Sequence, residues 1–169
     1  MSGQPFAVRP CSGSNLKMEE NMSRLSPATK QRVRDAEDAW NARDCDTLVL
    51  ANAIDCLWRN RVYFLWGREQ VRTYVERQLR REIDHRVIFE PWAEGDLRLA
   101  VRFASEFRND SGSWFRTHGC EEMEFDESGL VRRRFTSANE HAIQEHERML
   151  RWTAGPRPAD HPPLTELGF

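Results

Sequence analysis

The fold of this chain is decided by residues 97–139, which read LRLAVRFASEFRNDSGSWFRTHGCEEMEFDESGLVRRRFTSAN. Two turn signals, Asn109-Asp110-Ser111-Gly112 and Asp126-Glu127-Ser128-Gly129, divide this stretch into three long runs with strand character. Such runs, joined by short polar turns that contain glycine, form antiparallel hairpins. The stretch therefore predicts an antiparallel meander.

The flanking segments complete a predicted α+β domain. Ser26-Pro27 provides a helix N-cap and a proline at the first helical position, so a first helix is expected to run to about Ala42. The other expected elements are a short helix from residue 44, a strand over 56–61, a helix from 68, a strand over 85–92 and a short helix over 140–150. Helices first and strands afterwards predict helices packed on one strongly curved antiparallel sheet.

Length and composition fit one domain with two tails. The chain has 169 residues, enough for a single core that can hold a pocket. Residues 1–25 lack periodicity and are expected to be disordered, while 26–150 form the domain. Residues 151–169 include four of the eight prolines, which predicts an extended arm that wraps a neighbour.

Charge and cysteine content limit the classes of partner. The net charge of −2 gives no overall field for nucleic acid or an anionic membrane, so neither is expected as a partner. The four cysteines are far apart and read as reduced thiols. Because the sequence shows neither a bilayer-spanning segment nor a secretory signal, a cytoplasmic protein is expected.

Glu121 is the main candidate for chemistry. Strand periodicity places it on one face with five other residues, Phe115, Thr117, Gly119, Met123 and Phe125. A carboxylate in such a mostly apolar row is paired, exposed or functional. Alternation along the last strand places Arg133 on the concave face as the expected partner. The preferred interpretation of Glu121 is a structural ion pair with Arg133. The alternatives are that Glu121 is an acid that polarises a ligand, or that its face of the strand is exposed to solvent.

The remaining candidates are weaker. Asn60 is interpreted as a polar anchor for a ligand or as a cap at the end of a strand, since an amide cannot be a general base at neutral pH. Trp40, Trp58 and Phe115 are candidate pocket walls or ordinary core residues. His118 is expected on the opposite face of its strand, with little prospect of catalysis. Apolar and aromatic residues expected on the convex face of the strands, Trp114 first and Trp92 second, suggest a homodimer formed through sheet contacts.

Other patterns favour no site. His141 and His146 are five residues apart, which a helix would place on different sides, so no metal site is predicted. No cysteine occupies a recognisable nucleophile turn. The arginine run 132–134 is expected to form surface ion pairs.

Three motifs carry a family resemblance. They are Trp58-Arg59-Asn60-Arg61, Phe64-Leu65-Trp66-Gly67-Arg68-Glu69 and Phe125-Asp126-Glu127-Ser128-Gly129, in this order of elements. Over roughly residues 27–139 the chain resembles the nuclear transport factor 2-like, or SnoaL-like, superfamily. Within it, the chain is most similar to a bacterial and fungal subfamily of unknown function. The resemblance implies a conical, curved sheet around a pocket, which different members use for isomerisation, cyclisation, dehydration, epoxide opening or binding.

The resemblance also indicates what this chain lacks. Matched by motif order to the ketosteroid isomerase-like members, their carboxylate base falls at Asn60, their neutral acid at Glu121 and their hydroxyl donor near Ala36. The chain therefore keeps the acid but lacks both the carboxylate base and the tyrosine that donates the hydroxyl hydrogen bond, which argues against that isomerase mechanism. It also has His118-Gly119-Cys120-Glu121-Glu122-Met123 where the subfamily would show Tyr-Gly-Asn-Glu-Asn-Trp, which allows a diverged copy.

Two functional hypotheses follow. In the first, the protein holds a small, partly apolar metabolite without a cofactor and is a candidate lyase, isomerase or cyclase. Glu121 would then be its acid, with Asn60, Trp40, Trp58, Phe115 and Arg133 contacting the substrate. In the second, the protein is a non-catalytic binding or dimerisation module whose pocket is filled by side chains.

Overall fold

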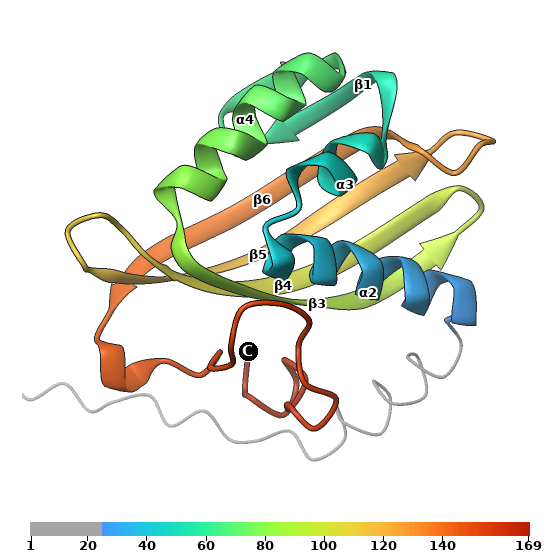
Figure 1. Ribbon diagram of the computed structural model, residues 1–169. Helices are drawn as coiled ribbons and strands as arrows, with labels where there is room; N and C mark the ends of the chain where they lie inside the picture. The colour runs from blue at the N-terminus through green and yellow to red at the C-terminus, as the bar shows by residue number, and fades with distance from the viewer. Residues whose placement is uncertain (1–24) are drawn as a thin grey trace, which may run out of the picture.

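Helices cover one face of a six-stranded sheet in the computed structural model, which describes residues 25–169 (Figure 1). The helices are α2 (Pro27–Ala42), α3 (Cys45–Leu50) and α4 (Gly67–Arg81). The strands are β1 (Asn52–Asn60), β2 (Tyr63–Trp66), β3 (Ile83–Gly95), β4 (Arg98–Arg108), β5 (Trp114–Phe125) and β6 (Val131–Ile143). The predicted α+β class is confirmed, while the predicted disorder of residues 1–25 falls almost wholly outside the described residues.

The sheet follows the order β2-β1-β6-β5-β4-β3. Strands β3 to β6 form the antiparallel meander, and β1 and β2 form a hairpin. The last strand, β6, pairs with β1 in parallel, so the sheet is mixed. Its curvature gives a concave face toward the helices and a convex face on the back (Figure 1).

Local signals in the sequence fix the helix starts. The Ser26 hydroxyl accepts a 3.1 Å hydrogen bond from the Thr29 amide, and Asp44 caps α3 through the Thr47 amide at 3.0 Å. Each cap satisfies a backbone N–H that the first turn leaves unpaired. Between the two helices, Arg43 adopts a left-handed φ of 60° and ends α2.

Two boundaries differ from the prediction. The expected helix over 140–150 is wrong, because β6 stays paired with β5 as far as Ile143 opposite Trp114, and only a 3-10 turn, Glu145–Glu147, follows. The first strand begins at Asn52 rather than at Cys56, because Asn52 pairs with Val131 of β6. In both places, pairing with a distant strand overrides the local pattern.

Gly119 in β5 is required by a close approach. A Cβ atom at this position would lie 2.6 Å from the Phe103 ring and 2.6 Å from the Ser137 carbonyl oxygen. Real Cβ atoms do not come this close to their neighbours. The missing side chain thus makes room on the concave face for the Phe103 ring, which lines the inner chamber described below.

The C-terminal arm packs on its own sheet. Leu150 and Leu164 are fully buried in a cluster with Ile88 of β3 and Ala104 of β4. The arm has neither helix nor strand, runs through bends and turns, and lies beneath the strands in Figure 1. The expectation that it wraps a neighbour is therefore corrected, because its apolar residues cover the convex face of this chain.

Candidate functional site

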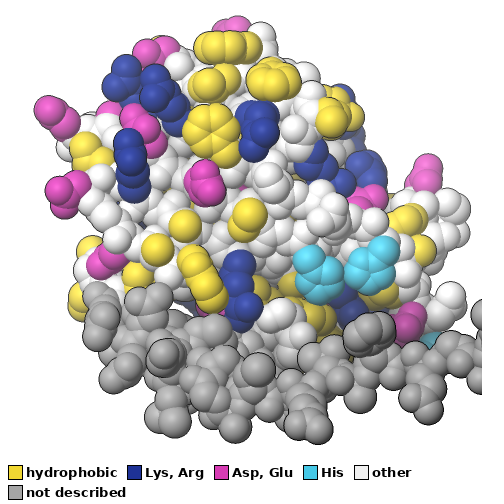
Figure 2. All heavy atoms as spheres, turned by 180° about the vertical axis from the view of Figure 1, so that it is seen from behind, with side chains coloured by type: hydrophobic (Ala, Val, Ile, Leu, Met, Phe, Trp, Pro, Cys, Tyr) yellow, Lys and Arg dark blue, Asp and Glu magenta, His cyan; other side chains and the backbone are white. Residues whose placement is uncertain are grey.

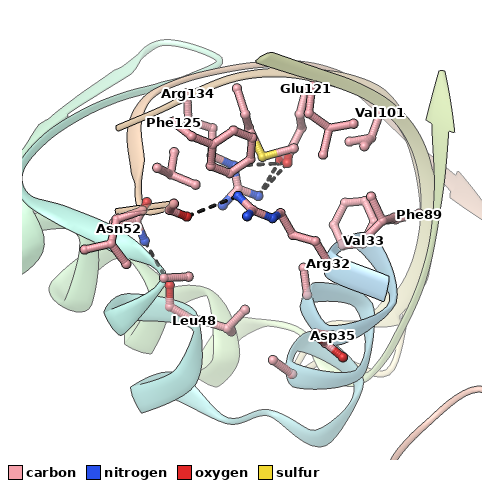
Figure 3. A pocket seen from close by; sticks show the side chains of 18 of the residues that line it. Arg32, Val33, Asp35, Leu48, Asn52, Phe89, Val101, Glu121, Phe125 and Arg134 are labelled. Atoms are coloured by element: carbon pink, nitrogen blue, oxygen red, sulfur yellow. Dashed lines mark hydrogen bonds and ion pairs between the residues drawn. The ribbon is translucent and has the colours of Figure 1, made fainter. Parts of the chain in front are cut away.

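A cavity of about 510 Å³ lies between the concave face of the sheet and helices α2 and α3 (Figure 3). Its wall is mostly apolar and includes Val33, Ala39, Leu48, Phe89, Val101, Met123, Phe125 and Val131. Six charged or amide residues interrupt this wall: Gln31, Arg32, Asp35, Asn52, Glu121 and Arg134. An apolar cavity with a few convergent polar groups is typical of small-molecule sites. We call it the outer cavity.

Glu121 and Arg134 form a bidentate ion pair in its wall. Arg134 Nε donates to Glu121 Oε2 at 3.0 Å, and Nη2 lies 2.7 Å from Oε1 and 2.6 Å from Oε2. Both side chains are largely buried, with 5% of Glu121 and 11% of Arg134 exposed. The Arg134 guanidinium also lies 4.2 Å from the centre of the Trp58 ring.

Two further hydrogen bonds complete this arrangement. Trp58 Nε1 donates to Thr136 Oγ1 at 2.9 Å, and Thr136 Oγ1 donates to Glu121 Oε1 at 3.0 Å. The carboxylate thus accepts from both a guanidinium and a hydroxyl. Such a network holds a buried charge in one orientation.

The predicted partner, Arg133, is wrong. It points to the convex face, is about half exposed and lies 3.8 Å from Glu124. The reason is a β-bulge. Phe125 pairs with Val131 and Glu124 pairs with Arg133, so Arg132 is an extra residue in β6. An extra residue inverts the alternation of side chains along the strand. Counting from Val131 therefore assigned Arg133 and Arg134 to the wrong faces.

Asn52 is a functional candidate that the sequence analysis missed. Its amide nitrogen donates to the Leu48 carbonyl at 2.9 Å, while its Oδ1 has no hydrogen-bond partner within the described residues. The residue is 1% exposed and lines the outer cavity. A buried acceptor without a partner is costly, so Oδ1 is suited to a ligand hydroxyl or N–H.

Arg32 was also missed. It extends from α2 across the outer cavity, where its Nη1 donates to the Gly129 carbonyl at 3.1 Å (Figure 3). Its guanidinium lies 4.3 Å from the centre of the Phe125 ring. Within residues 25–169 it forms no ion pair. Helix periodicity could have identified Arg32, because it is four residues from Ala36 on the same side of α2.

A second, smaller chamber of about 70 Å³ lies deeper in the cone. Trp40, Phe89 and Glu121 line both spaces, which therefore adjoin each other. The inner chamber is more polar, and its other lining residues include Asn60, Tyr74, Glu82, His85, Ser105 and Thr117. Its volume is enough for two or three water molecules or one small functional group.

The structure brings together some of the predicted site residues. Glu121 and Trp40 line the outer cavity, and both also reach the inner chamber with Trp58 and Asn60. Phe115 lines neither space and stacks on Phe107, with ring centres 5.5 Å apart. Its expected place as a pocket wall is corrected.

His118 lies on the back of the sheet, as expected. Its ring stacks on the His141 ring, with ring centres 5.6 Å apart, and forms a T-shaped pair with the Phe169 ring, with centres 5.0 Å apart. Across residues 25–169, no three His, Cys, Asp or Glu side chains gather as a set that could hold a metal ion. In the same range, no helix is long and apolar enough to cross a membrane.

Solved structures share this fold. An NTF2-like protein of unknown function from Exiguobacterium sp. 255-15 matches with a TM-score of 0.56 and 16% identity, over 66% of this chain and 98% of that one. SalBIII, an epoxide hydrolase/cyclase-like enzyme of pyran ring formation in the polyether salinomycin, matches with a TM-score of 0.59 and 14% identity, over 70% of this chain and all of that one.

The family is shown by the sequence itself. No curated protein sequence is detectably similar to the chain. A family model described as a protein of unknown function, DUF1348, matches residues 25–151, well over half of the 169 residues. This range holds the whole sheet and both cavities. The chain therefore belongs to the DUF1348 family, whose representative here has an NTF2-like fold.

Proposed function

We propose that this protein binds a small, partly apolar molecule in the outer cavity and acts on it as a lyase, isomerase or cyclase without a cofactor. The observation that carries the proposal is the 510 Å³ cavity between α2, α3 and the sheet. A volume in this range fits a ligand of drug or metabolite size. The apolar wall would take the body of the ligand.

The polar groups of the wall supply orientation. Asn52 Oδ1 accepts from a ligand donor, and Arg32 donates to a carbonyl or carboxylate near the rim. The Glu121–Arg134 pair presents fixed charges at the inner end of the outer cavity. Because each oxygen of Glu121 already accepts a hydrogen bond, this residue orients a ligand in our proposal.

The open space between the helices and the sheet argues against the competing hypothesis, a non-catalytic module whose pocket is filled by side chains. A filled module would leave no such space, whereas here α2 lines the cavity with the small Ala28, Ala36 and Ala39 beside the larger Arg32 and Trp40, and about 510 Å³ remains open. Small residues on the lining face of α2 keep the cavity open. This favours a ligand-binding protein over a filled module.

The test is to close the outer cavity from α2. Ala36 lines the cavity and is exposed to its interior, so Ala36→Trp fills the space without disturbing the core. Ala42→Trp is the matched control, because Ala42 is exposed on the same helix and does not line the cavity.

Both variants and the wild type would be screened by thermal shift against small ketones, enols, aromatic polyols and a metabolite extract. A ligand at a hundredfold excess over its Kd stabilises the native state by about 2.7 kcal/mol. Ligands that shift the wild type and Ala42→Trp but not Ala36→Trp support the proposal. Equal shifts in all three proteins would contradict it.

We also propose a homodimer, through a different surface from the one predicted. Trp114 is buried, and the Arg148 guanidinium covers it at 3.6 Å from the centre of its ring, so Trp114 is not available to a partner. Phe64 and Trp66 of β2 are 63% and 62% exposed, and apolar side chains gather at this end of the back face (Figure 2). Light scattering of Phe64→Glu is expected to show a monomer, whereas a dimer as in the wild type would contradict this interface.

The reduced state of the thiols supports a further expectation. Cys45, Cys56 and Cys120 are free in the structure. We keep the proposal of a reducing, cytoplasmic compartment, which fractionation of the host cell would test.

A further inference from the structure

Two titratable side chains face the inner chamber from adjacent elements. Glu82 follows the last residue of α4, and His85 is the third residue of β3. Their side chains approach to 3.5 Å, between Glu82 Oε2 and His85 Nε2. Both are largely buried, with 12% of Glu82 and 6% of His85 exposed.

The backbone between them is unusual. Asp84 has a left-handed φ of 53°, and β3 is irregular between Ile83 and Arg86, where its register with β4 shifts. A bulge of this kind turns a side chain and is common beside active sites. Here it allows a helix end and a strand start to direct Glu82 and His85 to the same space.

His85 has one nitrogen available. While Nε2 faces Glu82, Nδ1 has no hydrogen-bond partner among the described residues. Burial lowers the pKa of His85 to about 3, so the imidazole is neutral at pH 7. Burial also raises the pKa of Glu82 to about 7, so this carboxyl changes its protonation state near neutrality.

We propose that His85 is the proton acceptor of this site, that Glu82 positions it, and that the substrate is a small ketone or a related carbonyl compound. The body of the substrate occupies the outer cavity, and its carbonyl end enters the inner chamber between Trp40, Phe89 and Glu121. This inference rests on the proposed ligand-binding function. It replaces the base that the sequence analysis found missing at Asn60.

The proton transfer is balanced without any further reactant. His85 Nδ1 takes a proton from the carbon next to the carbonyl, the C–H electron pair becomes the C=C bond of an enolate, and the oxygen takes the charge. The His85 Nε2–H faces the ionised Glu82, which stabilises the imidazolium. The His85 Nδ1–H then returns a proton to carbon as the C=O bond re-forms, so the outcome is isotope exchange or isomerisation.

Other groups of the chamber suit the enolate oxygen. Burial raises the pKa of Tyr74 to about 12, so its hydroxyl remains a donor at neutral pH. Asn60 lines the same chamber and supplies amide donors. Donors placed where negative charge develops lower the barrier of such a step.

The charges around the pair come from three elements, α4, β3 and β6, and from the segments that join α2 to α3 and β1 to β2. Arg81 and Arg61 lie near Glu82 and favour its ionised form, whereas Glu140 of β6 opposes it. Arg43 acts on both residues, and Arg86 of β3 further disfavours a charged His85. These fixed charges leave Glu82 as the group that titrates near neutrality.

The first experiment follows deuterium exchange next to the carbonyl of cyclohexanone in D2O by proton NMR. The proteins are the wild type, His85→Gln, Glu82→Gln and the control His141→Gln, whose histidine is exposed on the back of the sheet. We expect exchange above the buffer rate in the wild type and the control, and at least a tenfold loss in His85→Gln. In Glu82→Gln the rate should fall and no longer rise with pH near 7.

The second experiment needs no ligand and does not depend on a variant at His85. In 15N-histidine spectra of the wild type, the Nδ1 and Nε2 shifts of His85 should exchange character as Glu82 titrates near pH 7. The same shifts should stay constant in Glu82→Gln. Constant shifts in both proteins would overturn the pair.

Binding of cyclohexanone, measured by saturation transfer, separates the two proposals. One result is that the saturation-transfer signal of cyclohexanone appears with the wild type and is lost with Ala36→Trp, but no deuterium exchange occurs. The proton-transfer site is then overturned, while the ligand-binding function stands. Exchange unchanged in His85→Gln also overturns it. If cyclohexanone does not bind, the proposed function fails for this ketone, and the histidine titration alone decides on the Glu82–His85 pair.

Discussion

The two faces of the sheet each hold a buried arginine–glutamate pair, and the surroundings of the two pairs differ. On the convex face, Arg116 Nε and Nη2 donate to Glu106 Oε1 at 2.9 and 2.6 Å. Backbone amides of Met149 and Leu150 donate to the same carboxylate at 3.0 to 3.1 Å. Glu106 is completely buried beneath the arm.

The concave pair has the same chemistry but an open neighbourhood. Glu121 and Arg134 form part of the wall of the outer cavity, where a ligand can reach them. The Glu106 carboxylate is enclosed by backbone amides of the chain itself and holds the start of the C-terminal arm in place. The Glu121 carboxylate lies beside a cavity, where it can contact a bound ligand. The comparison teaches that burial and pairing alone do not identify a functional charge; the adjacent space does.

The largest effect is expected from Glu106→Gln. It leaves Arg116 buried without its counter-charge and weakens the anchors of the arm. Breaking a buried pair from one side costs about 3 to 5 kcal/mol. Urea unfolding measures this loss, and limited proteolysis should show earlier cleavage within 151–169. A variant with wild-type stability and an intact arm would break the comparison.

A smaller loss is expected from Glu121→Gln. The amide can keep the Thr136 contact, and water from the cavity can hydrate Arg134, so the cost is about 1.5 to 3 kcal/mol. Urea unfolding under the same conditions gives the difference from Glu106→Gln. Equal losses at both positions would show that the outer cavity does not soften the penalty.

The pH dependence of stability should differ between the two faces, because the inner chamber holds the strongly shifted groups. Folding raises the pKa of Glu82 from 4.5 to about 7, so the native state binds the extra proton and loses stability as the pH rises through this window. His85, lowered from 6.5 to about 3, acts oppositely and costs stability as the pH falls from 6.5.

Glu82→Gln isolates the first of these contributions. It should match the wild type near pH 4.5 and exceed it at pH 8, by about 1 to 3 kcal/mol at roughly 1.4 kcal/mol per pKa unit. Denaturant titrations at the two pH values measure the gain. A variant less stable than the wild type at pH 8 would show that Glu82 is held ionised in the folded protein.

The smallest effect is expected from Arg133→Ala, the residue that the sequence analysis had placed in the pair. Its contact with Glu124 is long and exposed, so its removal should change the free energy of unfolding by less than about 0.5 kcal/mol. Arg134→Ala is the matched variant and should cost several times more. Thermal melts of the two proteins distinguish the faces, and a reversed order would refute the register described for β6.

Sequence patterns predicted the architecture because its signals are local. Ser26 at the first helix and the two glycine turns of the meander each act over a few residues, and all three lie where expected. Strand alternation also placed Glu121 on the concave face correctly. These are the features that backbone geometry and side-chain period determine without reference to distant segments.

The remaining features depend on contacts between distant segments. The bulge at Arg132 has no turn residue to mark it, so alternation gave Arg133 in place of Arg134. Leu150 and Leu164 are separated by prolines and show no period that would reveal a buried arm. Asn52 and His85 meet their cavities only through the pairing of β1 with β6 and the register shift in β3.

The extra residue at Arg132 also bears on how this sheet can change in length. Val131 and Arg133 already pair with two consecutive residues of β5, Phe125 and Glu124. Removing Arg132 would therefore join Val131 directly to Arg133 without changing the pairing of either. Val131 and Arg134 would keep their concave orientation. Removing a residue elsewhere in β6 would exchange inside and outside for the rest of the strand. Insertions and deletions among relatives should therefore concentrate at this position, where a change in length leaves the interior of the cone the same.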